Sequence, residues 1–157
     1  FQLTGAMLDR AVAEHGELAG VVVASPNNPT GTMITAENLR DLTEWTSARG
    51  VRLVSDEIYH GITYTGEGRG HCAWEFGRDA IVISSFSKYW GMPGWRVGWM
   101  LMPDDLAPLV DALSGSVSLC PPAAAQYAAI EAFCPQAYAE CDGQVREFAR
   151  TERKSAV

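Results

Sequence analysis

Residues 19–31 read Ala-Gly-Val-Val-Val-Ala-Ser-Pro-Asn-Asn-Pro-Thr-Gly, and this stretch sets the first unit of the fold. The part up to Ala24 is a short β-branched run of the kind that a buried parallel strand shows. The Asn, Pro and Gly residues that follow it predict a loop. Thr35 is then a candidate N-cap for a helix with apolar residues at helical spacing, which ends near Gly50. Strand, loop and helix are therefore complete once.

The same alternation continues along the rest of the chain. After Pro103, the acidic pair Asp104 and Asp105 suits the positive end of a helix dipole. Strands about 25–30 residues apart match crossover connections, so the sequence predicts an α/β fold, a three-layer sandwich with a mostly parallel sheet. The predicted strands span residues 19–24, 51–55, 80–84 and 96–102, and the predicted helices span residues 8–16, 35–50, 103–113, 121–133 and 135 onward.

Composition limits the class of protein. The chain has 157 residues, of which 47% are hydrophobic, enough for one compact domain without a disulfide or a metal to hold its core. Its four cysteines form no CxxC pair, which disfavours a zinc site and predicts reduced thiols in a cytoplasmic protein. A net charge of −7 argues against nucleic acid and anionic lipid as partners. No apolar stretch reaches the ~20 residues that span a bilayer.

Chemistry-bearing residues follow three of the predicted strands. The first is followed by residues 27–31, the second by Asp56-Glu-Ile-Tyr59, and the third by Ser84-Ser-Phe-Ser-Lys88. Ligands of α/β sheets bind beyond the carboxyl ends of the strands, so these side chains are expected to meet in one crevice. Each also has a purely structural interpretation, as a turn former, a helix cap or a surface lysine. A single chemistry explains them all together.

That chemistry is pyridoxal phosphate catalysis. The cofactor needs a lysine amine, for which Lys88 is the candidate, and an acid beside its ring nitrogen, for which Asp56 is the candidate. Tyr59 and Asn28 can donate to its phenolic oxygen. The candidate phosphate ligands are Ser85, Ser87 and Arg96.

Three motifs extend this reading to a family. Asn-Pro-Thr-Gly at 28–31, Asp-Glu-Ile-Tyr at 56–59 and Ser-Phe-Ser-Lys-Tyr-Trp-Gly-Met-Pro-Gly-Trp-Arg-Val-Gly-Trp at 85–99 resemble the class I/II aminotransferases, which are fold-type I pyridoxal phosphate enzymes. Their order and spacing match, and the third motif is long and highly specific. The resemblance extends over nearly the whole chain.

The resemblance implies a role for each candidate. Lys88 forms the internal aldimine and shuttles a proton between the substrate α-carbon and the cofactor. By the same resemblance, Asp56 contacts the pyridine nitrogen, and Asn28 and Tyr59 contact the phenolic oxygen. Ser85 and Arg96 bind the phosphate.

The resemblance also implies how the chain relates to a whole enzyme. Residues 1–157 correspond to part of the cofactor-binding large domain, and the family's N-terminal portion and small C-terminal domain lie outside them. Substrates would be an amino acid and a 2-oxo acid, and the full-length protein would be a homodimer. We expect this segment to have little activity alone. A β-lyase or ring-forming synthase that uses the same cofactor, and a non-catalytic remnant, stay open as alternatives.

Other conspicuous residues have simpler interpretations. Trp90, Trp95 and Trp99 are expected to pack in the core. His60 has no evident partner and is expected to be solvated. Glu57 is expected to face away from Asp56, because adjacent residues of an extended segment point to opposite sides.

Overall fold

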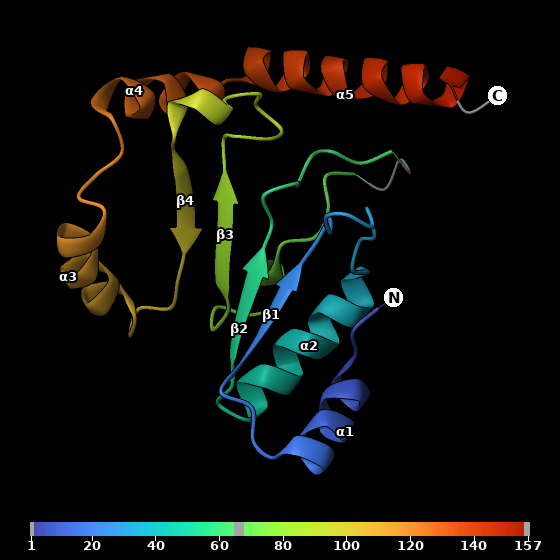
Figure 1. The fold of residues 1–157 in the computed structure, drawn as a ribbon, viewed down its shortest axis with the longest axis vertical. Helices are drawn as coiled ribbons and strands as arrows, with labels where there is room; N and C mark the ends of the chain where they lie inside the picture. Colours follow the sequence, from blue (N-terminus) through green and yellow to red (C-terminus); the bar gives the residue numbers. More distant parts are fainter. Residues whose placement is uncertain (1, 65–67, 156–157) are drawn as a thin grey trace.

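The computed structural model describes residues 2–64 and 68–155, with side chains described up to residue 151. Its centre is a four-stranded sheet in the order β1-β2-β3-β4 (Figure 1). The first three strands are parallel, and the fourth runs antiparallel to its neighbour. The α/β class and the mostly parallel sheet are therefore confirmed. The strands span Gly20–Ala24 (β1), Arg52–Asp56 (β2), Ile81–Ser85 (β3) and Gly98–Leu101 (β4).

Capping residues explain where the first two helices begin. Thr4 and Thr35 each accept, through the side-chain oxygen, the backbone N–H three residues further on. Gly16 ends the first helix at a φ of 89°, which favours glycine. The helices span Gly5–His15 (α1), Ala36–Ala48 (α2), Ala107–Val117 (α3), Ala123–Ala132 (α4) and Pro135–Ser155 (α5), with 3₁₀ turns at Ala73–Glu75 (η1) and Pro93–Trp95 (η2).

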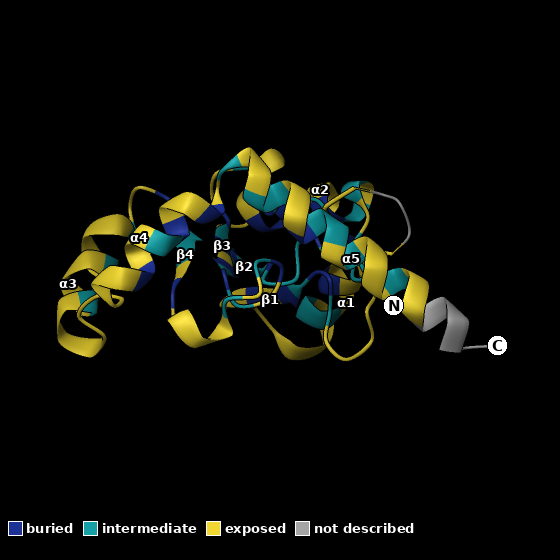
Figure 2. Cartoon of the chain, turned by 90° about the horizontal axis from the view of Figure 1, so that it is seen from above, coloured by how far each residue is buried: buried dark blue, intermediate teal, exposed yellow. Residues whose placement is uncertain are grey.

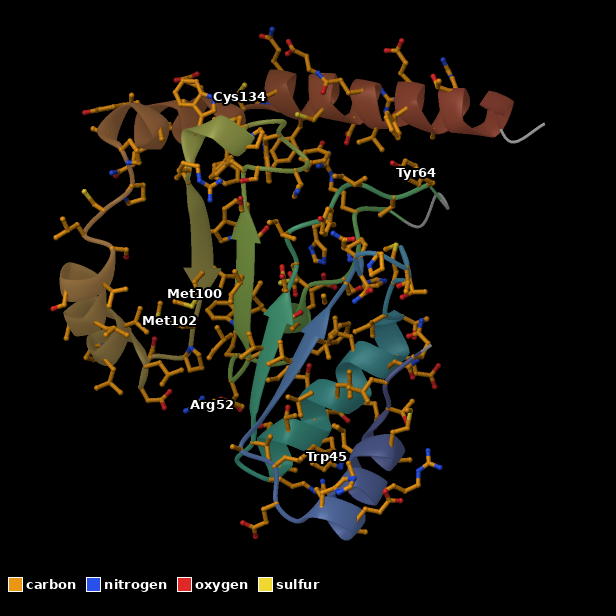
Figure 3. All side chains as sticks on the ribbon, in the orientation of Figure 1. Trp45, Arg52, Tyr64, Met100, Met102 and Cys134 are labelled. Atoms are coloured by element: carbon orange, nitrogen blue, oxygen red, sulfur yellow. The ribbon has the colours of Figure 1, made fainter. Side chains whose placement is uncertain are left out.

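Helix α3 begins later than the sequence predicts. The prediction puts Asp104 and Asp105 in its first turn, whereas the structure puts both before Ala107. Pro108 explains the difference, because a proline fits only the first turn of a helix. Asp105 instead pairs with Arg52 at the start of β2 (Figure 3). The prediction that Asp104 and Asp105 interact with the dipole of this helix in its first turn is therefore wrong.

Two apolar clusters hold the elements together. In the larger one, Leu39 and Leu42 of α2 are almost fully buried against one face of the sheet. Trp45 of α2 lies toward α1 (Figure 3) and donates its Nε1 to Asp9 at 2.8 Å. Figure 2 shows that α3, in contrast, is exposed almost throughout. The smaller cluster joins α4 to the loop after β3 and consists of Phe86, Val97, Ala125, Ala129 and Ala132.

The sheet buries one face and leaves much of the other open. Along β1, Val21 is buried on the α2 side, whereas Val22 is 76% exposed. Cross-strand partners share a face, and the register pairs Asp56 with Ile83, which is 41% exposed. The Asp56 side chain therefore belongs to the open face. Glu57, the next residue, is buried on the covered side, as the alternation of the chain predicts.

Candidate functional site

The loops that follow the three parallel strands meet at the carboxyl edge of the sheet. Asn28, in the loop after β1, donates through Nδ2 to the hydroxyl of Tyr59 at 3.0 Å. Tyr59 lies in the turn after β2, and the Nζ atom of Lys88, in the loop after β3, lies 5.4 Å from the centre of the Tyr59 ring. The structure thus brings together an amide, a phenol and a lysine that the sequence selected separately.

Backbone hydrogen bonds hold the loop after β1 in place. Gly31 N donates to Asn27 O at 2.7 Å, and Gly31 has a φ of 68°, which favours glycine. Ser25 N donates to Asp56 O at 3.0 Å, which ties the loop to the end of β2. Asn28 is therefore a turn residue whose amide is also presented to the neighbouring loop.

Asp56 presents its carboxylate on the open face of the sheet. Its Oδ1 atom accepts the N–H of Ile58 at 3.1 Å. Among the described residues, its Oδ2 atom has no hydrogen-bond partner and no basic side chain forms an ion pair with it. The carboxylate is therefore available to a cationic group of a ligand, such as a protonated ring nitrogen.

The Lys88 turn is anchored by buried aromatic rings on both sides. Phe86 and Tyr89 are 3% and 4% exposed, whereas the Lys88 side chain is exposed. Ser85 Oγ accepts the N–H of Ser87 at 2.9 Å and donates to Ser87 Oγ at 2.8 Å. The two serine hydroxyls and the lysine therefore share one compact turn after β3.

Arg96 lies beside this turn, and its guanidinium makes one hydrogen bond to the backbone. Val97 O accepts the N–H of Phe86 at 3.2 Å, so the backbone next to Arg96 runs along the start of the Lys88 turn. Arg96 itself has left-handed dihedral angles, φ 53° and ψ 49°. Its Nη1 atom donates to Pro93 O at 3.0 Å. A guanidinium carries five N–H donors, so this bond leaves donors for a phosphate beside Ser85.

Hydrogen bonds and an ion pair to α5 hold the Lys88 turn in place. Tyr89 donates its hydroxyl to Asp142 at 2.6 Å, and Arg69 pairs with the other carboxylate oxygen at 2.7 Å. The Arg69 guanidinium also lies over the rings of Tyr89 and Tyr138. Burial, together with the bond to Asp142, raises the pKa of Tyr89 to about 12. Sequence reasoning missed this network, because its members come from segments far apart in the chain.

The prediction that His60 is solvated is wrong. Its side chain is 22% exposed, and its Nδ1 atom lies 3.4 Å from a carboxylate oxygen of Glu57. Burial lowers the pKa of His60 below its ordinary value, although nearby Glu57 and Glu75 oppose the shift. Trp95 also departs from expectation, since it is 45% exposed rather than packed in the core.

A cavity of about 340 Å³ opens beside the pair formed by Asn28 and Tyr59. Its wall is mostly apolar and contains no charged side chain among the described residues. Tyr64, which also lines the cavity, lies beyond the carboxyl ends of β1 and β2 (Figure 3). Apolar contributors to the wall include Pro26, Pro29, Met33 and Ile62.

Comparison with known proteins assigns the chain to a family. The family model described as aminotransferase class I and II matches residues 1–155. The chain belongs to this family. Its curated relatives include a valine–pyruvate aminotransferase of Mycobacterium tuberculosis, 52% identical over 84% of this chain, and an aspartate aminotransferase of Geobacillus stearothermophilus, 37% identical over 85%. A crystal structure of an aminotransferase from Mycobacterium tuberculosis has a TM-score of 0.88 and 48% identity, covering 96% of this chain and 40% of that one.

The chain spans about a third of the length of these class I and II aminotransferases, since each curated match covers 34% of the relative. Members of the family generally use pyridoxal phosphate. The described side chains fit that group. An exposed lysine lies beside the Asn28 and Tyr59 pair, and the Asp56 carboxylate has an oxygen without a partner among the described residues.

Proposed function

We propose that the polypeptide carrying this chain is a pyridoxal phosphate-dependent aminotransferase, which moves an amino group between an amino acid and a 2-oxo acid. The observation that carries the proposal is the meeting of Asn28, Tyr59 and Lys88, from loops after three adjacent strands. In this proposal, residues 1–157 are part of the cofactor-binding large domain. Bound pyridoxal phosphate supplies a ring that withdraws electrons from the substrate α-carbon.

Each side chain then has a defined task. Lys88 holds the cofactor through its amine and, once free, moves the proton at the substrate α-carbon. Asp56 keeps the ring nitrogen protonated, because an opposite charge favours the charged form. Tyr59 and Asn28 donate to the phenolic oxygen. Ser85, Ser87 and Arg96 bind the phosphate, for which the Arg96 guanidinium has donors besides the one bonded to Pro93 O.

The apolar cavity supports a substrate with an aliphatic side chain. It lies next to Asn28 and Tyr59, and its described wall is mostly apolar, which suits an aliphatic side chain. The valine–pyruvate aminotransferase among the relatives supports the same choice. We therefore propose valine as amino donor and pyruvate as acceptor, ahead of aspartate.

The proposal includes a homodimer acting in the cytoplasm. Support for a partner surface comes from apolar side chains on the outside of the described structure. Leu109, Leu113 and Val117 of α3 are 66%, 60% and 73% exposed and lie one helical turn apart. Contiguous exposed apolar side chains of this kind mark interaction surfaces.

An assay with the full polypeptide that carries this chain tests the proposed reaction. With valine and pyruvate we expect alanine and the 2-oxo acid of valine in equal amounts, at a higher rate than from aspartate. Lys88→Ala should lower the rate by about 10²-fold or more. Lys154→Ala is the matched control, since Lys154 is the other lysine in the chain. Release of ammonia from the amino acid without an acceptor would show a lyase instead. Equal rates for wild type and Lys88→Ala would rule out both the aminotransferase and the lyase reaction at Lys88.

A further inference from the structure

Behind the turn that carries Asp56 and Tyr59 lies a buried carboxylate, that of Glu57. The residue is 2% exposed. Its Oε1 atom accepts from Ser55 Oγ at 3.0 Å and from Ala73 N at 2.8 Å. Burying a carboxylate is costly unless such bonds compensate for lost water. This one therefore holds β2, the turn after β2 and η1 to each other.

The backbone of Glu57 makes a second set of bonds. Its N–H donates to Ile83 O at 2.8 Å, and its carbonyl accepts from His60 N at 3.0 Å and from Ser84 Oγ at 3.3 Å. Both bonds to β3 lie at the carboxyl end of that strand. Side chain and backbone of Glu57 together fix the position of the turn relative to β3, the strand that leads into the Lys88 loop.

His60 completes the enclosure of the carboxylate. Its Nδ1 atom lies 3.4 Å from Glu57 Oε2, and its ring packs so closely on Gly70 that a Cβ there would come within 3.0 Å of it. Its Nε2 atom is buried without a partner among the described residues. The Glu57 carboxylate and the backbone of Ser25 both interact with the imidazole. Other titratable groups near this side are Cys72, Glu75 and His71.

We propose that Glu57 is a positioning residue for the reaction. Alternation along the chain puts Glu57 on the covered side of the sheet and Asp56 on the open side. Because the two residues are adjacent, fixing the Glu57 side chain also fixes the direction in which the Asp56 side chain points. Tyr59 follows two residues later in the same turn and reaches Asn28 and Lys88. Glu57 thus fixes the positions of Asp56 and Tyr59, although it does not itself contact the cofactor. This inference rests on the proposed function.

Two substitutions and a matched control test the role. Glu57→Gln keeps an oxygen that can accept from Ser55 and Ala73, whereas Glu57→Ala removes it. Glu75→Ala is the control, because Glu75 is a carboxylate of the adjacent η1 whose side chain is 50% exposed and bonds Cys72 N and His71. All three are made in the full polypeptide, and each is measured with and without pyridoxal phosphate.

The measurements separate positioning from general stability. With cofactor, we expect Glu57→Ala to weaken binding by about 10-fold or more and to shift the pH midpoint of the absorption band of the Lys88-bound cofactor. Glu57→Gln should recover most of the affinity, and Glu75→Ala should match the wild type. A loss of folded protein alone would lower the urea midpoint without moving the pH midpoint of the remaining holoenzyme. If both Glu57 variants show a lower urea midpoint and an unchanged pH midpoint, Glu57 is not a positioning residue.

Without cofactor, hydrogen exchange of the peptide spanning residues 56–62 reports on the turn directly. We expect its amides to exchange at least about 10-fold faster in Glu57→Ala and at the wild-type rate in Glu75→Ala. Unchanged exchange in both Glu57 variants would contradict the anchoring. If wild-type protein takes up no cofactor on Lys88, the proposed function fails, and the exchange result still decides whether Glu57 holds the turn.

Discussion

At the scale of single residues, the site depends on three side chains that come from different loops. Tyr59 is central, because it accepts from Asn28 and lies under the Lys88 amine. No described residue accepts its hydroxyl proton, so the proton can be donated to a ligand. Asp56 stands at the end of the neighbouring strand with one oxygen bound to its own turn. The three loops after β1, β2 and β3 therefore place Asn28, Tyr59 and Lys88 within reach of one another.

The Tyr59 hydroxyl can be removed with little change of shape. We expect Tyr59→Phe to weaken pyridoxal phosphate binding by about 10-fold, the effect of losing one hydrogen bond to a charged oxygen. Equilibrium titration of cofactor absorbance measures it. Tyr127→Phe is the control, since Tyr127 is 74% exposed on α4. Equal affinities of the two variants would contradict the assigned role.

His60 predicts how stability depends on pH. Burial holds its folded-state pKa below the ordinary 6.5, so near pH 6 the unfolded chain binds more protons than the folded one. Stability should therefore fall as pH drops through 6.5 toward the folded pKa. Urea unfolding between about pH 7.5 and 5.5 measures this, and His60→Gln should flatten the dependence. His71→Gln, with a side chain 41% exposed in the wild type, should retain it. An unchanged slope in His60→Gln would show another group to be responsible.

At the scale of elements, local patterns predicted most boundaries within a residue or two. The strand predicted at 80–84 is Ile81–Ser85, and the helix predicted from Thr35 begins at Ala36. Such features depend on β-branched runs and caps, which are local. The partner of His60 and the network around Asp142 could not be predicted, because they depend on how distant segments fold back. The antiparallel direction of β4 is likewise set by tertiary packing.

Close packing between β3 and β4 gives a prediction at this scale. A Cβ on Gly98 would lie 2.6 Å from Ser84 O, whereas one on Gly94 would meet nothing within 4 Å. We expect Gly98→Ala to lower the free energy of unfolding by about 1–3 kcal/mol, the usual cost of overpacking. Gly94→Ala serves as its control, and urea unfolding compares them. If both variants lose the same stability, the contact is not what constrains β4.

At the scale of the whole molecule, the described structure leaves large apolar side chains in solvent. Val22 and Ile83 lie on the open face of the sheet, and Leu113 lies on the outside of α3. None of the described helices is both long and apolar enough to cross a bilayer. The chain spans about a third of its curated relatives, and these surfaces are where further chain or a second copy could pack.

Those surfaces predict self-association of the isolated 157-residue chain. Exposed apolar stripes drive association, so sedimentation velocity should show oligomers despite the net charge of −7. Leu113→Glu should reduce them, because it puts a charge in the middle of the α3 stripe. Ser116→Glu adds the same charge at an exposed polar position of α3 and is the control. A monomeric wild-type chain would contradict the prediction.

The assignment of Lys88 to the cofactor is tested most directly by trapping. The full polypeptide is mixed with pyridoxal phosphate, reduced with borohydride and digested, and the labelled lysine is identified by peptide mass. We predict a label on Lys88 that is absent from Lys88→Ala and greatly diminished in a denatured sample. Label confined to Lys154 or the amino terminus, or label on Lys88 at the level of the denatured sample, would contradict the proposed site.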